Sequence, residues 1–435
     1  MAAPTPEPFP EPTAVRDRAV DVARLGALLV VVFGHCVLLL ATIDSGGVHI
    51  ANLIGAVPAV APLTWVAQVM PLFFVAGGAA GSYSYRSEKT WGSWLFVRAQ
   101  RLCRPAFFYL AAWSAGLLAV RLTLGEESAA GLGGESVALL WFLGVYLVTL
   151  AFVPALTRLR SVRGVATVLG CLIVAAAVMD ALRFDTGDPG AGAPNFVIVW
   201  LIPVVIGVAY ARRLLGPRLA AAIGSSALAA QIALAVFGPY DVSLVVTGAE
   251  RVSNVAPPTA LLALHCTWMA CAFVVLAPRV ARWAGRSRLW PAVVAGNRGA
   301  MTLYLWHIPA IAITAFGLHA VGLDAYDVAA PDFWWLLALR AVVFTPVMLV
   351  LLVVLAPLEH RRLPWWDGPV RAGGSRASAA GVLICVAGVA LVLLARSGLD
   401  APAGWTALGV FLAAGGAARL VASTPSGVTA RKAPG

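Results

Sequence analysis

Long runs of apolar residues, separated by short polar segments, dominate the chain. A helix needs roughly 20 apolar residues to cross the hydrocarbon core of a bilayer, and runs of about that length recur along the whole sequence. They predict an all-α, polytopic integral membrane helical bundle. The apolar segment 46–62, interrupted by Pro58 and Pro62, is expected to form an interfacial or re-entrant loop. The pattern places the membrane spans at residues 22–43, 62–84, 104–123, 136–156, 163–182, 195–212, 218–238, 257–278, 298–319, 333–357, 378–396 and 403–421.

The composition agrees with a membrane protein. Of the 435 residues, 60% are hydrophobic and only 12% are charged, whereas soluble domains average about 25% charged residues. A net charge of +11 would also suit a nucleic-acid partner. However, the basic residues lie in short loops between the apolar runs, so we expect membrane lipids and no nucleic acid as partners. The six cysteines lack metal-ligand spacing and no nucleotide or metal motif is present, so we predict no metal and no bound cofactor.

The distribution of Lys and Arg predicts the orientation. If the spans alternate, most of the 31 basic residues fall on one side of the membrane. Basic loops face the cytoplasm, so both termini are predicted to be cytoplasmic and the protein is placed in the cell membrane. Arg340 lies within the tenth span. The opposite side keeps only Arg121, Arg183, Arg251 and Arg396.

The domain boundaries follow from the same pattern. Residues 1–15, rich in Pro, Glu and Ala, are predicted to be a disordered cytoplasmic tail. Residues 16–362 form a ten-span transmembrane domain, residues 363–377 a cytoplasmic linker, residues 378–422 two accessory spans, and residues 423–435 a second cytoplasmic tail.

The first span carries an unusual set of polar residues. Arg24 and His35 are eleven residues apart, which on a helix is three turns plus roughly 20°, so both lie on one face about 16 Å apart. Asp21 is on nearly the same face and can pair with Arg24. The ordinary interpretation is an interfacial charge pair and a histidine bonded to a neighbouring helix. Because polar groups at this depth are costly, a functional site is the alternative hypothesis.

Polar residues also occur in later spans. His307 lies nine residues beyond Arg298, about 14 Å into the membrane, with Tyr304 one turn before it. An interhelical hydrogen bond remains the structural alternative for this pair. Arg340, about 10 Å inside the tenth span, is expected either to reach outward or to face a polar cavity. His265 in the eighth span is kept as a pocket residue.

Four motifs in order give the chain a resemblance to a known family. An Arg is followed by ten residues and a His in the first span, and "RLCR" lies at the foot of the third. "MPLFFVAGGAAG" carries Phe73 and Phe74, and "AMTLYLWHIPAI" carries the late Tyr and His. The chain resembles, over about residues 15–360, the acyltransferase 3 family of integral membrane O-acyltransferases. The ten-span domain is thus acyltransferase-like.

The resemblance implies an activity and a site. Such enzymes move an acyl group from a cytoplasmic acyl-CoA, or a similar thioester, to a hydroxyl of a sugar, a lipid-linked glycan or a small natural product. A base must take the hydroxyl proton, and histidine titrates near the working pH. The co-substrate is acyl-CoA. The implied catalytic residues are His35 and His307, the donor-binding residues are Arg24, Arg101 and Arg104, and the supporting residues are Asp21, Phe73, Phe74, Tyr304 and Arg340.

One departure keeps other functions open. The family has Ser-Gly soon after the phenylalanine pair, where this chain has Ala76-Gly77-Gly78, so a hydroxyl is missing. One alternative is a multi-span transporter or flippase with the buried His and Arg residues as a relay. It is disfavoured because the two halves show no internal repeat. The other is a related fold recruited to different small-molecule chemistry.

Overall fold

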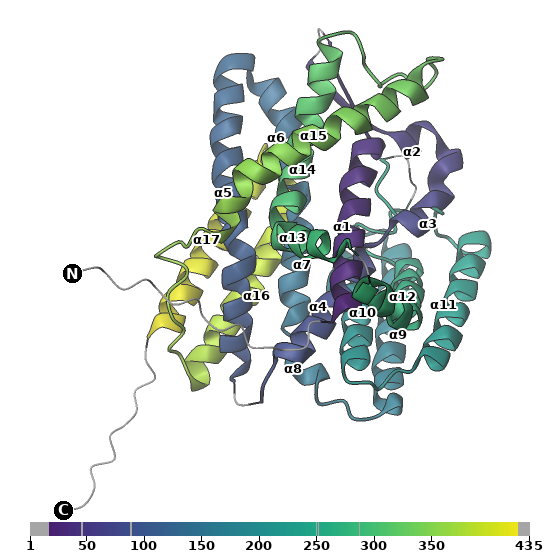
Figure 1. Ribbon diagram of the computed structural model, residues 1–435, viewed down its shortest axis with the longest axis vertical. Helices are drawn as coiled ribbons and strands as arrows, with labels where there is room; N and C mark the ends of the chain where they lie inside the picture. The colour runs from purple at the N-terminus through teal and green to yellow at the C-terminus, as the bar shows by residue number, and fades with distance from the viewer. Residues whose placement is uncertain are drawn as a thin grey trace, which may run out of the picture.

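The computed structural model describes residues 17–44, 47–87, 89–248, 250, 252–286 and 288–424. Within these residues, twelve helices are long and apolar enough to cross a membrane, which confirms the predicted all-α polytopic class (Figure 1). The first predicted tail, residues 1–15, lies outside the described residues, as do the last residues of the second tail, from 425 onward.

The helices that carry the spans are separated by shorter elements. The short elements are α2 (Leu53–Ala56), η1 (Pro58–Leu63), α3 (Thr64–Ala67), α6 (Glu126–Ala138), α8 (Val153–Leu156), η2 (Pro189–Gly192) and α13 (Trp290–Arg298). The main helices of the spans are α1 (Arg18–Leu38), α4 (Met70–Ser84), α5 (Trp91–Leu124), α7 (Leu140–Leu150), α9 (Val162–Thr186), α10 (Asn195–Ala211), α11 (Pro217–Phe237), α12 (Ala260–Arg286), α14 (Ala300–His319), α15 (Phe333–His360), α16 (Gly374–Ser397) and α17 (Pro402–Ser423). The span of α7 also includes the end of α6.

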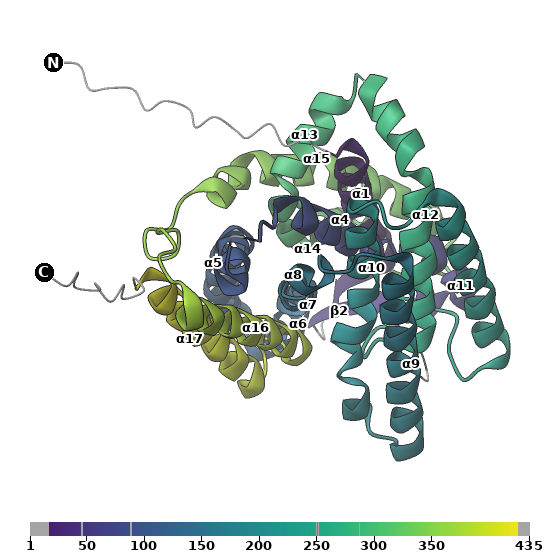
Figure 2. The same cartoon turned by 90° about the horizontal axis from the view of Figure 1, so that it is seen from below.

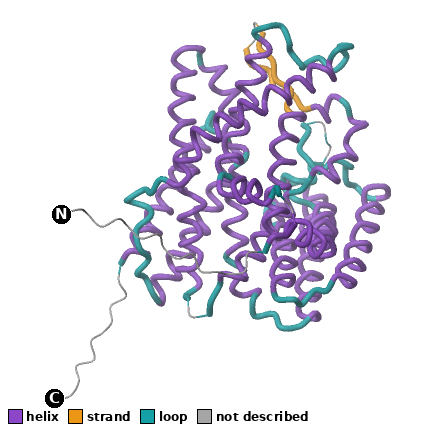
Figure 3. Tube along the Cα trace, in the orientation of Figure 1, coloured by secondary structure: helices purple, strands orange, loops and turns teal. Residues whose placement is uncertain are grey.

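A β-hairpin follows the first span, where the apolar pattern predicted a longer helix. Strands β1 (Leu39–Asp44) and β2 (Gly47–Asn52) pair antiparallel, with Thr42 opposite His49. Figure 3 shows the two strands at the upper end of the molecule. Helix α1 therefore ends at Leu38 rather than at 43, and segment 46–62 is a strand followed by short helical turns instead of one loop. β-branched residues such as Thr42 and Ile50 favour extended backbone.

Two helices are longer than their apolar runs. Helix α5 begins at Trp91 rather than at 104, and α12 continues to Arg286 rather than ending at 278. The added helical segments are basic, and in α5 the Arg98 guanidinium lies 3.7 Å from the centre of the Trp94 ring. Hydropathy marks the part of a helix that lies in lipid and not the point where the helix ends.

Hydrogen bonds join the ends of several helices at one face of the bundle. The Asp17 carboxylate, which caps α1, accepts bonds from Tyr83 at the end of α4 (2.8 Å) and Tyr210 at the end of α10 (3.0 Å). Arg18 donates to the Ala284 carbonyl of α12 at 3.2 Å. We call this face, at which α1 begins, the arginine face, and the opposite one the hairpin face. In Figure 2, helices α1, α4, α7 and α14 lie between α5, α16 and α17 on one side and α9 to α12 on the other.

Glycines allow the helices to approach closely. A Cβ added at Gly388 of α16 would lie 2.9 Å from the Gly144 carbonyl oxygen and 3.0 Å from a Val148 methyl group of α7. Small residues at such contacts are typical of membrane helices, which pack without a hydrophobic driving force between them. Helix α16 thus packs directly on the ten-span domain. The accessory role predicted for α16 and α17 stays a prediction.

Candidate active site

Two histidines from distant parts of the chain meet in the middle of the bundle. His35 Nδ1 of α1 lies 2.8 Å from His307 Nε2 of α14, and the planes of the two rings are parallel to within 1°. His307 is completely buried, whereas His35 is half-buried. Sequence analysis selected both residues but did not predict that they touch.

The hydrogen bonds of His307 determine where the protons of the neutral pair lie. His307 Nδ1 is 2.7 Å from the Tyr304 carbonyl oxygen, one turn earlier on α14. A carbonyl only accepts, so Nδ1 carries the hydrogen and His307 Nε2 has the lone pair. His35 Nδ1–H then donates to that lone pair, and His35 Nε2 is left as an acceptor. No described residue forms a hydrogen bond with this nitrogen, so it is available to take a proton from a bound substrate.

Arg340 fixes the end of the helix that carries His35. Its side chain is only 2% exposed and donates to the carbonyl oxygens of Cys36 (2.5 Å) and Val37 (3.4 Å). The last carbonyls of a helix have no partner within it, and a cation suits that negative end. The arginine therefore does not reach outward, which was one of the two positions expected of it. It holds the last turn of α1, beside His35.

Tyr304 contacts its neighbours through its backbone carbonyl, its hydroxyl and its ring. Its carbonyl orients His307, and its hydroxyl donates to the Leu139 carbonyl at 2.6 Å. The ring lies 5.2 Å from that of Phe142 on α7. The residue thus joins α14 to the segment that begins α7.

The two phenylalanines of α4 belong to the same aromatic cluster. The rings of Phe73 and Phe74 each lie 5.4 Å from that of Phe142, and Phe74 is stacked on Trp200 of α10 at 4.8 Å. All four side chains are largely buried. These rings pack α4, α7 and α10 together, and Phe142 also contacts the ring of Tyr304.

Tyr146 of α7 packs against Gly77 of α4 and was not selected from the sequence. A Cβ added at Gly77 would lie 2.5 Å from the Tyr146 hydroxyl oxygen, so the phenol of α7 occupies the space that a side chain at position 77 would need. Arg24 and Arg98 are close enough to Tyr146 for electrostatic interaction. A tyrosine in an apolar span gives no signal in one sequence, and only its arginine neighbours distinguish it.

The predicted donor-binding arginines do not share one environment. Arg24 is half-buried, and Arg101 is exposed. Arg104 forms an ion pair with Asp367 at 2.6 Å, with both side chains largely buried, and thereby fixes the segment after α15. Arg104 therefore has a structural contact, and its role in binding the acyl donor stays a prediction.

Asp21 and His265 have structural contacts. The buried Asp21 accepts a bond on its backbone oxygen from Asn297 of α13 at 2.9 Å. His265 Nε2 lies 2.8 Å from the Gln68 carbonyl oxygen, which fixes the segment before α4. Neither contact joins these residues to the His35–His307 pair.

A polar cluster at the hairpin face was not predicted. His319 Nδ1 lies 3.0 Å from Asp324 Oδ2, and Thr42 donates to the same carboxylate oxygen. His319 follows His307 on α14 by three turns, and Thr42 follows His35 on β1. Among the described residues, no group of three or more His, Cys, Asp or Glu side chains could hold a metal ion.

Comparison with known proteins identifies the family. The acyltransferase 3 family, described as an acyltransferase domain, matches residues 17–357, which is most of the chain. No curated protein matches the sequence, and no solved structure does. The match covers α1 to α15 and therefore includes both histidines and the Tyr304 and Phe73–Phe74 motifs. The chain is a member of the acyltransferase 3 family, a multi-pass membrane acyltransferase.

Proposed function

We propose that the protein transfers an acyl group from acyl-CoA to a hydroxyl, with His35 as the general base. The observation that carries the proposal is the hydrogen-bonded order of Tyr304, His307 and His35, which leaves the lone pair of His35 Nε2 available. An alcohol is a poor nucleophile, so a positioned base is what the reaction needs. The family match favours this enzyme over the transporter alternative.

The reaction balances with these residues alone. The acceptor hydroxyl docks at His35 Nε2 and gives its proton to that nitrogen as its oxygen attacks the thioester carbonyl carbon. His307 accepts from His35 Nδ1–H, so it keeps the imidazole oriented and stabilises the imidazolium that forms. The carbon–sulfur bond then breaks, and His35 returns the proton to the departing thiolate. The products are an ester and the free thiol of CoA.

The donor enters from the arginine face, which we place at the cytoplasm. Arg24 lies about 16 Å below His35 on α1, near Tyr146 and Arg98. Guanidinium groups bind anionic phosphate oxygens bidentately. The acceptor is a sugar, a lipid-linked glycan or a small natural product, and the enzyme works in the cell membrane with both termini cytoplasmic.

Substitution of His35 tests the proposal. In reconstituted membranes, His35→Ala removes proton transfer and is expected to lower kcat roughly 10²- to 10⁴-fold. His35→Gln keeps a polar side chain of similar size but cannot act as an efficient base, so it should be nearly as slow. The KM for the donor should change little, since the lost interaction is with the transition state.

The matched control is His360→Gln, which makes the same chemical change at an exposed histidine at the end of α15. It should turn over like the unmodified protein at equal expression. A well-expressed His35→Gln variant with near-normal kcat would exclude His35 as the base.

A further inference from the structure

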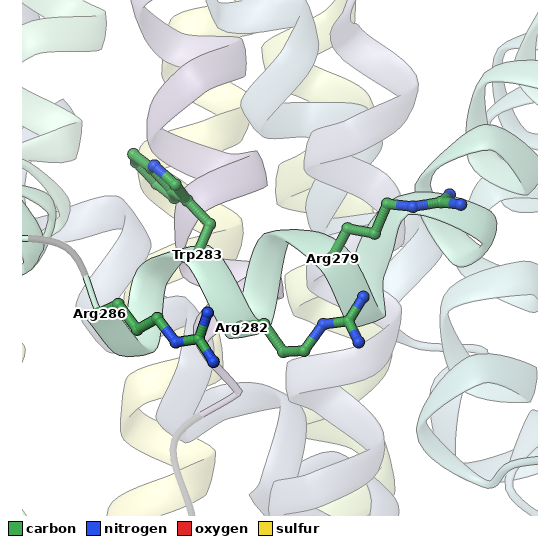
Figure 4. Close-up of a pocket in the computed structure, with 4 residues that line it drawn as sticks. All are labelled: Arg279, Arg282, Trp283 and Arg286. Atoms are coloured by element: carbon green, nitrogen blue, oxygen red, sulfur yellow. The ribbon is translucent and has the colours of Figure 1, made fainter.

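A cavity of about 520 Å³ lies at the arginine face, on the last two turns of α12. It is lined by Arg279, Arg282, Trp283 and Arg286 (Figure 4). At 100° per residue, these four positions fall within an arc of roughly 100° on one side of the helix. In Figure 4 the side chains of Arg282 and Arg286 extend to the same side of the α12 ribbon, whereas Trp283 extends to the other. The cavity is therefore a basic concavity with an aromatic side chain at its edge.

The charges of this cavity are not neutralised within the described part of the chain. All three guanidinium groups are exposed, and none has an ion-pair partner among the described residues. The Trp283 side chain is 50% exposed, so part of its ring is available for stacking. Three uncompensated guanidinium groups around one volume favour a ligand that carries several negative charges.

The helical segment that lines the cavity contacts the first residue of α1, the helix that carries His35. Arg18, the first residue of α1, donates to the Ala284 carbonyl within the lining segment, and its guanidinium lies over the Trp290 ring. Along α1, Arg24 is then about 9 Å and His35 about 25 Å beyond Arg18. A ligand with its charged end in the cavity needs a long, slender arm to present a reactive group at His35.

We propose that this cavity binds the nucleotide end of the acyl-CoA donor. This inference rests on the proposed function and names the part of the donor that the enzyme recognises. Arg279, Arg282 and Arg286 bind the phosphorylated ribose end of CoA, and Trp283 stacks on the adenine. Arg24 meets the diphosphate, from which the pantetheine arm continues toward His35. The volume is in the range of small-molecule sites, about 300–1,000 Å³. An anionic lipid headgroup offers the same phosphate chemistry, so the test separates the two sources.

The test compares two donors in two proteins. The triple variant Arg279→Gln/Arg282→Gln/Arg286→Gln is compared with Arg158→Gln/Arg160→Gln/Arg163→Gln. The second variant removes the same charge from exposed arginines in the loop after α8 and the first turn of α9. Both are assayed in neutral phosphatidylcholine nanodiscs and in nanodiscs that also contain an anionic phospholipid. The donors are acyl-CoA and acyl-pantetheine, which has the arm and the thioester but no phosphate. For the first variant we expect the KM for acyl-CoA to rise roughly tenfold to a hundredfold with kcat unchanged, and the KM for acyl-pantetheine to stay the same.

The outcomes that overturn the inference are distinct. An unchanged KM for acyl-CoA, or an equal rise in the control variant, would show that the nucleotide does not bind in this cavity. If the variant affects both donors equally, and only in nanodiscs containing an anionic phospholipid, the occupant is a lipid headgroup.

A binding measurement separates this site from the proposed reaction. Equilibrium dialysis of labelled CoA against the unmodified protein and the triple variant should show weaker binding to the variant. Binding of CoA that depends on these arginines, without any acyl transfer, would refute the proposed function and leave the site in place. Undiminished binding to the variant would refute the site.

Discussion

At the scale of single residues, the position of one hydrogen atom determines what the histidine pair can do. The Tyr304 carbonyl requires the hydrogen on His307 Nδ1, and this in turn makes His307 Nε2 the acceptor for His35. In the proposed reaction, His307 therefore acts on His35 without touching the substrate. It is a positioning residue, and its essential property is an acceptor atom at the place of Nε2.

Replacement of His307 should separate this role from simple packing. His307→Leu fills the space but offers no acceptor, so His35 loses its preferred tautomer, and we expect kcat to fall roughly 10²-fold. His307→Gln places a side-chain carbonyl that can accept from His35 Nδ1–H, and should recover part of that loss. The measurement is kcat for both variants at matched expression. Equal activities in the Leu and Gln variants would mean that hydrogen-bond acceptance is unimportant.

The sequence identifies the polar residues of the site better than their contacts. His35 and His307 are visible because a polar residue within an apolar run is rare. Their contact is not visible, since it depends on how α1 and α14 pack. Tyr146 was missed because tyrosine is common in membrane helices, and Arg340 gave no sign that it would bind carbonyls of α1. The Thr42–His319–Asp324 cluster was missed because it arises at helix ends and in a hairpin.

At the scale of elements, close packing of helix pairs depends on single glycines. In α16, Gly388 has the Gly144 backbone and the Val148 side chain of α7 within about 3 Å of where a Cβ would be. In α17, Gly409 has no atom within 4 Å of that place. The same substitution at the two glycines should therefore have different consequences for stability.

Gly388→Leu should force α16 away from α7, whereas Gly409→Leu adds a side chain in open space. Overpacking typically costs about 1–3 kcal/mol, so we expect a lower melting temperature for Gly388→Leu and little change for Gly409→Leu. Thermal unfolding of the purified proteins in one detergent gives the comparison. If Gly388→Leu melts like the unmodified protein, α16 does not depend on this contact.

The elements also show what the apolar pattern can and cannot predict. All twelve predicted spans correspond to helices, because a span must satisfy its backbone internally. Helix ends outside the apolar runs were missed, as at Trp91 and Arg286. The hairpin was missed because its apolar, β-branched residues look like a continuation of α1, and the hold of Arg340 on the end of that helix cannot be seen in the sequence.

At the scale of the whole molecule, the separation of two polar faces is consistent with a proposed reaction whose donor enters from one side. The arginine cavity of α12 and the His319–Asp324 pair lie at opposite ends of the bundle, with the histidine pair between them. The proposed donor site and the hairpin face are therefore reached from opposite sides of a membrane.

Reporter fusions test this orientation. The distribution of Lys and Arg predicts that a reporter inserted near Gly187 is extracytoplasmic and that one in the segment between α4 and α5 is cytoplasmic. A second extracytoplasmic signal is expected in the loop around Asp324. A cytoplasmic signal at Asp324 would reverse the orientation and with it the side from which the donor enters.

Helix α1 is held at both of its ends. Two tyrosine hydroxyls bind the carboxylate of Asp17 at one end, and the guanidinium of Arg340 binds the carbonyls of Cys36 and Val37 at the other. Hydrogen bonds at both ends of α1 oppose movement of this helix along the membrane normal. We therefore expect the depth of His35 to stay constant during the proposed reaction, with the two substrates reaching this residue from opposite sides.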